Sequence, residues 1–149
     1  MIKKLSIIIP AYNEAATIHL ILEKIKQVQL VNDIEKEIII VNDFSTDNTK
    51  GAVETYISKN ENLNIQYFEH PKNKGKGAAL HTGIKNATGE YLIIQDADLE
   101  YTPVEYNDLL KPVLIGVADV VYGSRFVGSN PHRVLFFWHT IGNKFLTFL

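Results

Sequence analysis

Five short apolar runs, rich in β-branched residues, divide this chain and constrain its fold more than any other feature. They predict strands at residues 5–10, 37–41, 63–68, 91–95 and 119–122. Stretches with helical periodicity separate these runs. Strands that alternate with helices are typical of a parallel sheet with right-handed crossovers. The sequence therefore predicts one α/β domain, with a mostly parallel, doubly wound sheet and helices on both of its faces.

Apolar stripes and residues that favour helix ends predict the helices. The first should open near Asn13 and end near Gln29, because apolar residues recur along one of its faces. Those residues are Ile18, Ile21, Leu22, Ile25 and Val28. A second helix should contain Val53, Tyr56 and Ile57, with Asp47 or Ser45 as its N-cap. A third is expected at residues 78–87, with Gly89 closing it. Two more are expected from Pro103 to about residue 115 and at residues 134–149.

The composition excludes several classes of protein. The chain has 149 residues, enough for one domain with a core, and its formal net charge of -2 argues against bulk nucleic-acid binding. It has no cysteine, so neither disulfides nor thiolate metal sites can form. The first apolar run is too short for a signal peptide or a membrane span. We therefore expect a cytosolic protein.

Two aspartates, Asp96 and Asp98, directly follow the apolar run at residues 91–95, which predicts a buried strand. Open α/β sheets bind their ligands at the carboxyl ends of the strands. With Glu100, the two carboxylates make a hard-oxygen site for Mg²⁺ or Mn²⁺, and such an ion could hold a diphosphate. A solvated acidic turn is the alternative that these residues alone leave open.

Four loops with unusual chemistry, at residues 10–14, 42–47, 96–100 and 123–126, should open at the same edge of the sheet. Tyr12 could stack on a base, and Asp43 could accept hydrogen bonds from a base or a ribose. Turn formers or helix caps are the alternative for both residues. Lys74 and Lys76 flank a glycine at the start of a helix, a position that suits an anion, although Lys74 could be merely solvated.

Five segments, at residues 6–14, 40–47, 75–80, 95–100 and 123–126, occur in an order that resembles the family 2 glycosyltransferases. These are inverting enzymes of the Rossmann-like GT-A fold. Within the family, the chain is most similar to the dolichyl-phosphate mannose synthase-like, or polyprenyl-phosphate glycosyltransferase, group. The resemblance covers nearly the whole chain, and it implies a single GT-A domain.

The resemblance also implies a role for individual residues. The first nucleotide-binding loop would contain Pro10, Tyr12 and Glu14, and the second would contact base and ribose through Val41 and Asp43. The metal and diphosphate motif would be Asp96, Ala97 and Asp98, with Glu100 as a further metal ligand. Arg125 matches an arginine near the donor diphosphate and the acceptor phosphate, so Asp98 and Arg125 are the expected catalytic residues. Asn42, Phe44 and Thr102 depart from the common pattern.

The activity implied is the metal-dependent transfer of a hexose, with Mg²⁺ or Mn²⁺ as cofactor. The donor would be a nucleotide sugar of the GDP-mannose or UDP-glucose type, and the acceptor a polyprenyl or dolichyl phosphate at the cytoplasmic face of the membrane. A phosphate monoester has a second pKa of about 6, so this acceptor needs no general base, and the sequence offers no obvious candidate for one. Two alternatives remain: transfer to a saccharide hydroxyl in cell-surface glycan synthesis, and a non-catalytic nucleotide-sugar-binding fragment.

The C-terminal part raises two further expectations. Members of this family continue past the end of this sequence, so we expect residues 1–149 to be a catalytic domain truncated at its C-terminus. Residues 134–149 predict an amphipathic helix with aromatic residues on its apolar side, among them Trp138 and Phe145. This helix is either a core helix or a peripheral contact with the membrane surface.

Overall fold

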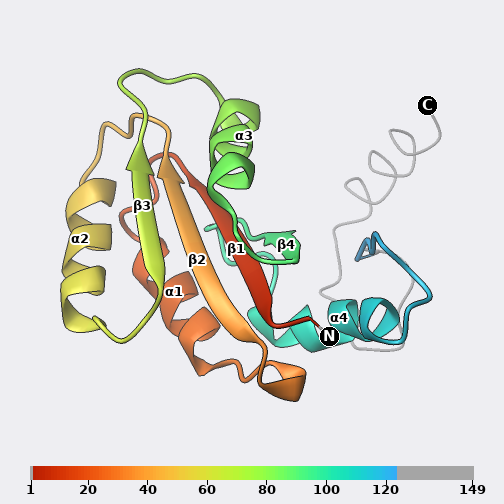
Figure 1. Ribbon diagram of the computed structural model, residues 1–149. Helices are drawn as coiled ribbons and strands as arrows, with labels where there is room; N and C mark the ends of the chain where they lie inside the picture. The colour runs from red at the N-terminus through yellow and green to blue at the C-terminus, as the bar shows by residue number, and fades with distance from the viewer. Residues whose placement is uncertain (1, 124–149) are drawn as a thin grey trace, which may run out of the picture.

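The computed structural model describes residues 2–123, which form a four-stranded sheet with helices around it (Figure 1). The strands are β1 (Lys4–Ala11), β2 (Glu35–Asn42), β3 (Ile65–Glu69) and β4 (Tyr91–Ile94). Their order across the sheet is β3-β2-β1-β4, and each neighbouring pair is parallel. The predicted α/β class and the parallel sheet are thus confirmed.

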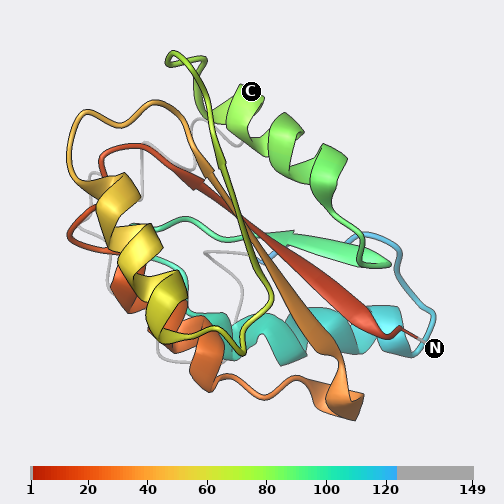
Figure 2. The ribbon, with the colours of Figure 1, turned by 60° about the vertical axis from the view of Figure 1, so that its left-hand side comes forward.

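Helices cover both faces of the sheet. The α-helices are α1 (Ile18–Gln27), α2 (Thr49–Lys59), α3 (Lys76–Asn86) and α4 (Tyr106–Leu114), and the short 3₁₀ turns are η1 (Val31–Asp33) and η2 (Pro103–Glu105). Figure 2 shows α3 on one side of the sheet and α1, α2 and α4 on the other. The larger core lies between the sheet and these three helices, where Ile7, Ile9 and Ile40 are fully buried.

Helix α1 begins five residues later than the sequence predicts. Asn13 has a φ of 59°, which is left-handed and cannot start an α-helix, and residues 14–17 form a turn instead. The predicted stripe is otherwise confirmed, since Ile18, Ile21, Leu22 and Ile25 are completely buried. The helix ends at Gln27, and Val28 lies beyond it with an extended backbone.

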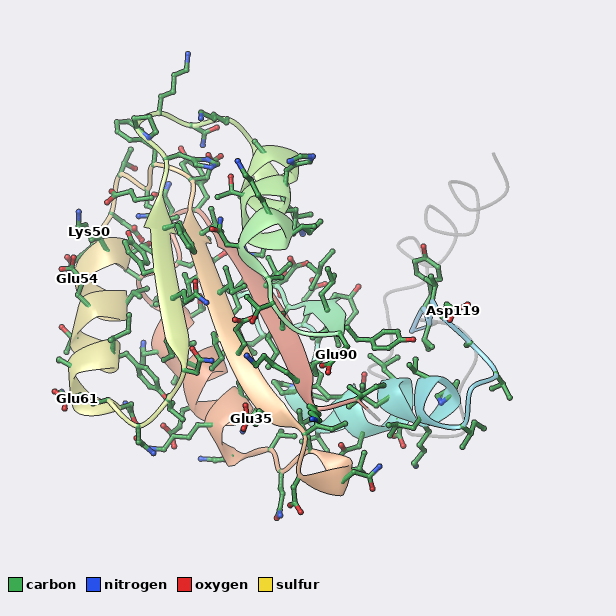
Figure 3. All side chains as sticks on the ribbon, in the orientation of Figure 1. Glu35, Lys50, Glu54, Glu61, Glu90 and Asp119 are labelled. Atoms are coloured by element: carbon green, nitrogen blue, oxygen red, sulfur yellow. The ribbon has the colours of Figure 1, made fainter. Side chains whose placement is uncertain are left out.

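Two predicted helix ends also differ. The N-cap of α2 is Asn48, and the Asp47 carboxylate accepts a hydrogen bond of 3.0 Å from the backbone N–H of Thr49. The Ser45 hydroxyl instead accepts from the backbone N–H of Asn13, in the loop after β1. The helix predicted around Val53 is confirmed as α2. Lys50 and Glu54 point outward from it in Figure 3, while Val53 is buried. Gly89 does not cap α3. A Cβ at this glycine would lie 2.8 Å from the backbone oxygen of Lys4, so Gly89 permits close approach to β1.

The strand predicted at residues 91–95 forms as β4, but among residues 2–123 only one of its faces is covered, so the prediction of a buried strand holds for that face alone. Leu92 and Ile94 are 42% and 47% exposed, whereas Tyr91 and Ile93 pack against the larger core. The reason is that α3, on the side of Leu92 and Ile94, packs mainly on β1 and β2.

The prediction of a fifth strand at residues 119–122 is wrong for this structure. These residues pair with no strand among residues 2–123, and Tyr122 is largely exposed. A β-branched run has strand propensity, but a strand forms only where its backbone finds a ladder partner. The predicted loop residue Arg125 and the predicted helix at residues 134–149 lie outside the described residues. In the part of the chain that is described, no helix is long and apolar enough to cross a bilayer.

Candidate functional site

Three of the four predicted loops meet at the carboxyl edge of the sheet and surround a pocket of about 420 Å³. A volume of this size suits a single small-molecule ligand. The pocket also takes in the loop before α3 and the first turn of that helix. Its lining residues are Pro10, Ala11, Tyr12, Glu14, Asp43, Asn73, Gly75, Lys76, Ala79, Asp96, Ala97 and Asp98.

The loops after β1 and β2 are joined by hydrogen bonds. The Asn13 side-chain oxygen accepts a hydrogen bond of 2.8 Å from the backbone N–H of Thr46, and the backbone N–H of Asn13 donates to the Ser45 hydroxyl at 2.9 Å. The Asp47 carboxylate accepts from the backbone N–H of Ala15 at 3.0 Å. The left-handed conformation of Asn13 therefore lets one loop close on the other. Tyr12, next to it, is 49% exposed and lines the pocket.

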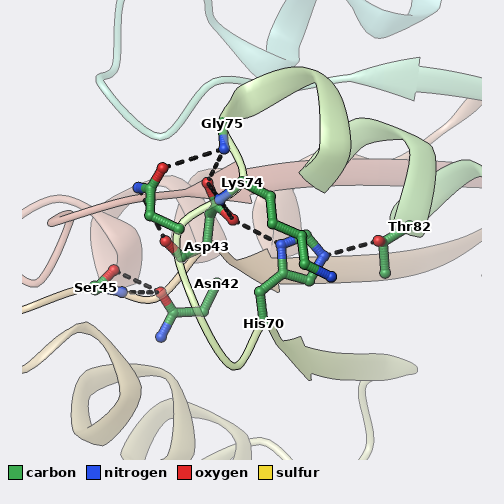
Figure 4. A network of polar contacts seen from close by, with 8 residues as sticks. Asn42, Asp43, Ser45, His70, Lys74, Gly75 and Thr82 are labelled. Atoms are coloured by element: carbon green, nitrogen blue, oxygen red, sulfur yellow. Dashed lines mark hydrogen bonds and ion pairs between the residues drawn. The ribbon is translucent and has the colours of Figure 1, made fainter.

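A buried polar network lies beneath the pocket, centred on Asp43, which is 3% exposed (Figure 4). His70 Nδ1 donates to Asp43 Oδ1 at 2.6 Å, and His70 Nε2 lies 2.9 Å from the hydroxyl of Thr82 on α3. Burial by itself would raise the pKa of Asp43. Hydrogen bonds from His70 and from the backbone N–H groups of Lys74 and Gly75 outweigh this effect and hold the pKa below its ordinary value.

Asp43 thereby fixes the glycine-containing loop that leads into α3. Its carboxylate accepts hydrogen bonds from the backbone N–H of Lys74 at 2.9 Å and from that of Gly75 at 2.6 Å. Gly75 has a φ of 86°, a left-handed conformation that glycine adopts most easily. This turn brings the N-terminus of α3 to the pocket, where the first backbone N–H groups of a helix favour an anion.

The turn that carries the two aspartates is held from below by Gln95, which is buried. The Gln95 side-chain amide donates to the backbone oxygens of Asp96 and Tyr101 at 3.0 Å and 3.2 Å, and its oxygen accepts from the Tyr106 hydroxyl at 2.7 Å. Burial raises the pKa of Tyr106. The Tyr106 hydroxyl therefore stays protonated and remains a donor to Gln95, and the turn is tied both to the sheet and to α4.

The two aspartates reach the pocket in different ways. Asp96 Oδ1 forms an ion pair of 2.6 Å with Lys76 Nζ, whereas the side chain of Asp98 is exposed and accepts from the backbone N–H of Glu100 at 3.0 Å. Among residues 2–123, no three Asp, Glu or His side chains lie close enough together to hold a metal ion by themselves. A Mg²⁺ or Mn²⁺ ion is commonly held by one or two carboxylates together with substrate phosphates, so Asp96 and Asp98 fit that pattern.

The pocket brings together most of the residues that the sequence singles out. Those that line it are Pro10, Tyr12, Glu14, Asp43, Asp96, Ala97 and Asp98. Val41 does not line it, and its fully buried side chain packs with Ile39 and with Ala79 of α3. Glu100 is exposed on the acidic turn and does not line the pocket either.

The sequence reasoning missed His70 as a partner of Asp43. A signal was present, because His70 directly follows β3 and Asp43 directly follows β2. The register pairs Asn42 with Glu69, so Asp43 and His70, which follow them, lie side by side. That inference requires the register, which the sequence alone does not supply.

A family comparison adds to this geometry. The sequence model described as glycosyl transferase family 2 matches residues 6–145. Among curated proteins, a dolichyl-phosphate β-glucosyltransferase of Dictyostelium discoideum is 33% identical, over 81% of this chain and 39% of its own. A dolichol-phosphate mannosyltransferase of Pyrococcus furiosus is 31% identical, over 83% of this chain and 34% of its own. This chain thus spans little more than a third of the length of these relatives.

Solved structures give the same fold. A mannosyltransferase from Pyrobaculum calidifontis, in complex with GDP-Man and Mn²⁺, superposes with a TM-score of 0.62 at 32% identity, covering 70% of this chain and 30% of that one. A glucosyl-3-phosphoglycerate synthase from Mycobacterium tuberculosis, in complex with Mn²⁺, UDP and glucosyl-3-phosphoglycerate, gives a TM-score of 0.60 at 25% identity. That match covers 76% of this chain and 40% of the other. The predicted GT-A fold is confirmed.

Proposed function

The chain belongs to glycosyl transferase family 2, and from that membership we propose that it transfers a hexose from a nucleotide sugar to a polyprenyl phosphate. The observation that carries the proposal is one pocket that contains an exposed aromatic ring, Tyr12, at one loop and two carboxylates, Asp96 and Asp98, at another. An aromatic ring suits a base, and carboxylates suit the metal ion of a metal-bound diphosphate. The base and the diphosphate of a nucleotide sugar would thereby each meet complementary side chains.

The nucleoside would lie over the loops after β1 and β2. Tyr12 would stack on the base, and Pro10 and Glu14 would shape the same side of the pocket. Asp43 would contribute to the site by holding the backbone of Lys74 and Gly75 in place, because its carboxylate already accepts several hydrogen bonds. A direct contact from Asp43 Oδ2 to a base or ribose is compatible with this arrangement, since Asp43 lines the pocket.

The diphosphate would lie between the acidic turn and the N-terminus of α3. Asp96 and Asp98 would hold a Mg²⁺ or Mn²⁺ ion, which when bound would neutralise charge on the leaving nucleoside diphosphate. Two relatives of known structure contain Mn²⁺ with a nucleotide or nucleotide sugar, and this supports the choice of ion. From the family resemblance, Arg125 would add positive charge at the diphosphate and the acceptor phosphate, and Glu100 would be a further ligand of the metal.

The acceptor is proposed from the relatives' names and from the chemistry of the pocket. The two curated relatives act on dolichyl or dolichol phosphate. A phosphate acceptor is largely dianionic near neutral pH, so it attacks without a base. Since a polyprenyl chain stays in the bilayer, transfer would take place at the cytoplasmic face of the membrane, with peripheral contact between protein and lipid.

A transfer assay tests this proposal. The protein is incubated with Mn²⁺, a short polyprenyl phosphate and either GDP-mannose or UDP-glucose, and the glycolipid is measured by mass spectrometry. We expect a glycolipid that disappears when EDTA removes the metal. A parallel reaction offers a saccharide in place of the polyprenyl phosphate. Transfer to the saccharide hydroxyl alone would support the saccharide acceptor, and donor binding without any transfer would support a non-catalytic binding role.

A further inference from the structure

We propose that Lys76 is an internal counter-cation of the acidic turn, which neutralises Asp96 while no divalent cation is bound and pairs with the donor diphosphate when donor and metal enter. This inference rests on the proposed function, because it assigns the diphosphate and the metal to this pocket. The observation behind it is the ion pair of 2.6 Å between Lys76 Nζ and Asp96 Oδ1. Both residues line the pocket, whereas the other lysine ion pairs of residues 2–123 join side chains outside it.

The backbone of Lys76 is held while its side chain stays mobile enough to change partners. Lys76 is the first residue of α3, and the residue before it, Gly75, is fixed by the buried carboxylate of Asp43. The Lys76 side chain itself is 58% exposed, and that of Asp96 is 26% exposed. The ammonium group can therefore exchange one anionic partner for another without any movement of the helix.

A divalent cation and the donor diphosphate should interact with Lys76 in opposite ways. A divalent cation bound at Asp96 would compete with the Lys76 ammonium for that carboxylate, and two cations close to each other repel. The diphosphate of a donor brings negative charge to the N-terminus of α3, where a lysine serves as a point charge for phosphate. Lys76 should therefore weaken the binding of the metal alone and strengthen the binding of the nucleotide.

Calorimetry on Lys76→Met separates these two effects. We expect Mn²⁺ alone to bind this variant about fivefold more tightly than the wild-type protein, the upper range for loss of an exposed ion pair. UDP and GDP, measured in EDTA, should bind about fivefold more weakly for the same reason. The matched control is Lys74→Met, which removes the same charge from the same loop but at a residue that does not line the pocket. It should change either affinity by less than about twofold, since salt screens exposed charges.

Thermal unfolding verifies that each variant is folded, and Lys76→Gln repeats the test with a polar side chain. The proposal is overturned if Mn²⁺ binds Lys76→Met no more tightly than the wild type, if neither protein binds Mn²⁺, or if Lys74→Met shows the same gain. In these cases, nucleotide binding by the wild-type protein would still leave the proposed function standing. If the wild-type protein binds neither Mn²⁺ nor any nucleotide or nucleotide sugar, the proposed function itself fails.

Discussion

His70 Nδ1 lies 2.6 Å from Asp43 Oδ1, and the two residues follow the ends of the neighbouring strands β3 and β2. This contact joins the base of the pocket to α3, because the other ring nitrogen of His70 reaches Thr82 on that helix. Asp43 also holds the backbone of Lys74 and Gly75. The buried Asp43 carboxylate thus fixes the loop that leads into α3, whose first residue is Lys76.

Asp43→Asn should lower the free energy of unfolding by about 2 kcal/mol, because both carboxylate oxygens face hydrogen-bond donors. An asparagine must turn its amide group toward one of them. Chemical denaturation at pH 7 measures the loss, and Asp119→Asn, at an exposed residue outside the pocket, is the control. A variant as stable as the wild-type protein would show that the network contributes little.

The effect of Asp43 should also depend on pH in a defined direction. Its folded-state pKa is depressed below the ordinary value of 3.8, so its contribution to stability is present above pH 3.8 and is lost as pH falls through the folded pKa. The difference in unfolding free energy between wild type and Asp43→Asn should therefore shrink as the pH falls below 3.8. Denaturation series at several pH values check this, and a difference that grows on acidification would contradict it.

Asp98→Ala should abolish the part of nucleoside diphosphate binding that depends on Mn²⁺, because it removes a carboxylate ligand and its charge. The fold should survive, since the side chain is exposed and accepts a local hydrogen bond from the Glu100 backbone. Calorimetry with and without EDTA measures the metal-dependent part. Asp108→Ala, an acid on α4 outside the pocket, serves as the control, and unchanged Mn²⁺ dependence in a folded Asp98→Ala would exclude this aspartate as a ligand.

Tyr12→Ala should weaken UDP or GDP binding by about tenfold or more, the usual loss when a base loses its aromatic stacking partner. Tyr12→Phe keeps the ring and should bind nearly as well as the wild-type protein. Because the side chain is 49% exposed, neither change should disturb the core. Fluorescence or calorimetric titration measures both variants, and equal losses in the two would assign the role to the hydroxyl.

Gly89→Ala should destabilise the fold by several kcal/mol, roughly the range for overpacking against a rigid backbone. The new Cβ would lie 2.8 Å from the Lys4 oxygen and 2.8 Å from the Ser6 nitrogen. Gly77→Ala is the matched control, because a Cβ there meets nothing within 4 Å and alanine favours a helix. Thermal unfolding should show a lower melting temperature for the first variant and an unchanged or higher one for the second.

Most of the sheet could be predicted from the sequence because β1 and β2 each contain a continuous run of buried apolar residues, at positions 7–9 and 38–41. Such runs are buried on both faces of a parallel sheet, so their composition alone identifies them. The start of α1 could not be predicted, because Asn13 takes a left-handed conformation whose partners are Ser45 and Thr46 in a distant loop. Strand propensity at residues 119–122 failed for the same kind of reason, since pairing depends on a partner elsewhere in the chain.

The pocket could be predicted in outline, because loops at the carboxyl edge of a parallel sheet must converge. The pocket-lining positions of Tyr12, Asp43 and Asp98 agree with that argument. The contacts of Asp43 and Lys76 could not be foreseen. The first depends on strand register, and the second depends on where α3 begins, two residues before the predicted start.

The hydrogen bonds from Asn13 to the loop after β2 have a consequence for protein engineering. Since this side chain accepts from the backbone of both Thr46 and Asp47, we expect the two loops that would hold the base to move together. Substitutions in one loop should then be non-additive with substitutions in the other. A redesign of nucleotide preference would have to exchange residues 10–14 and 42–47 as one cassette, with Asn13 retained as the joint between them.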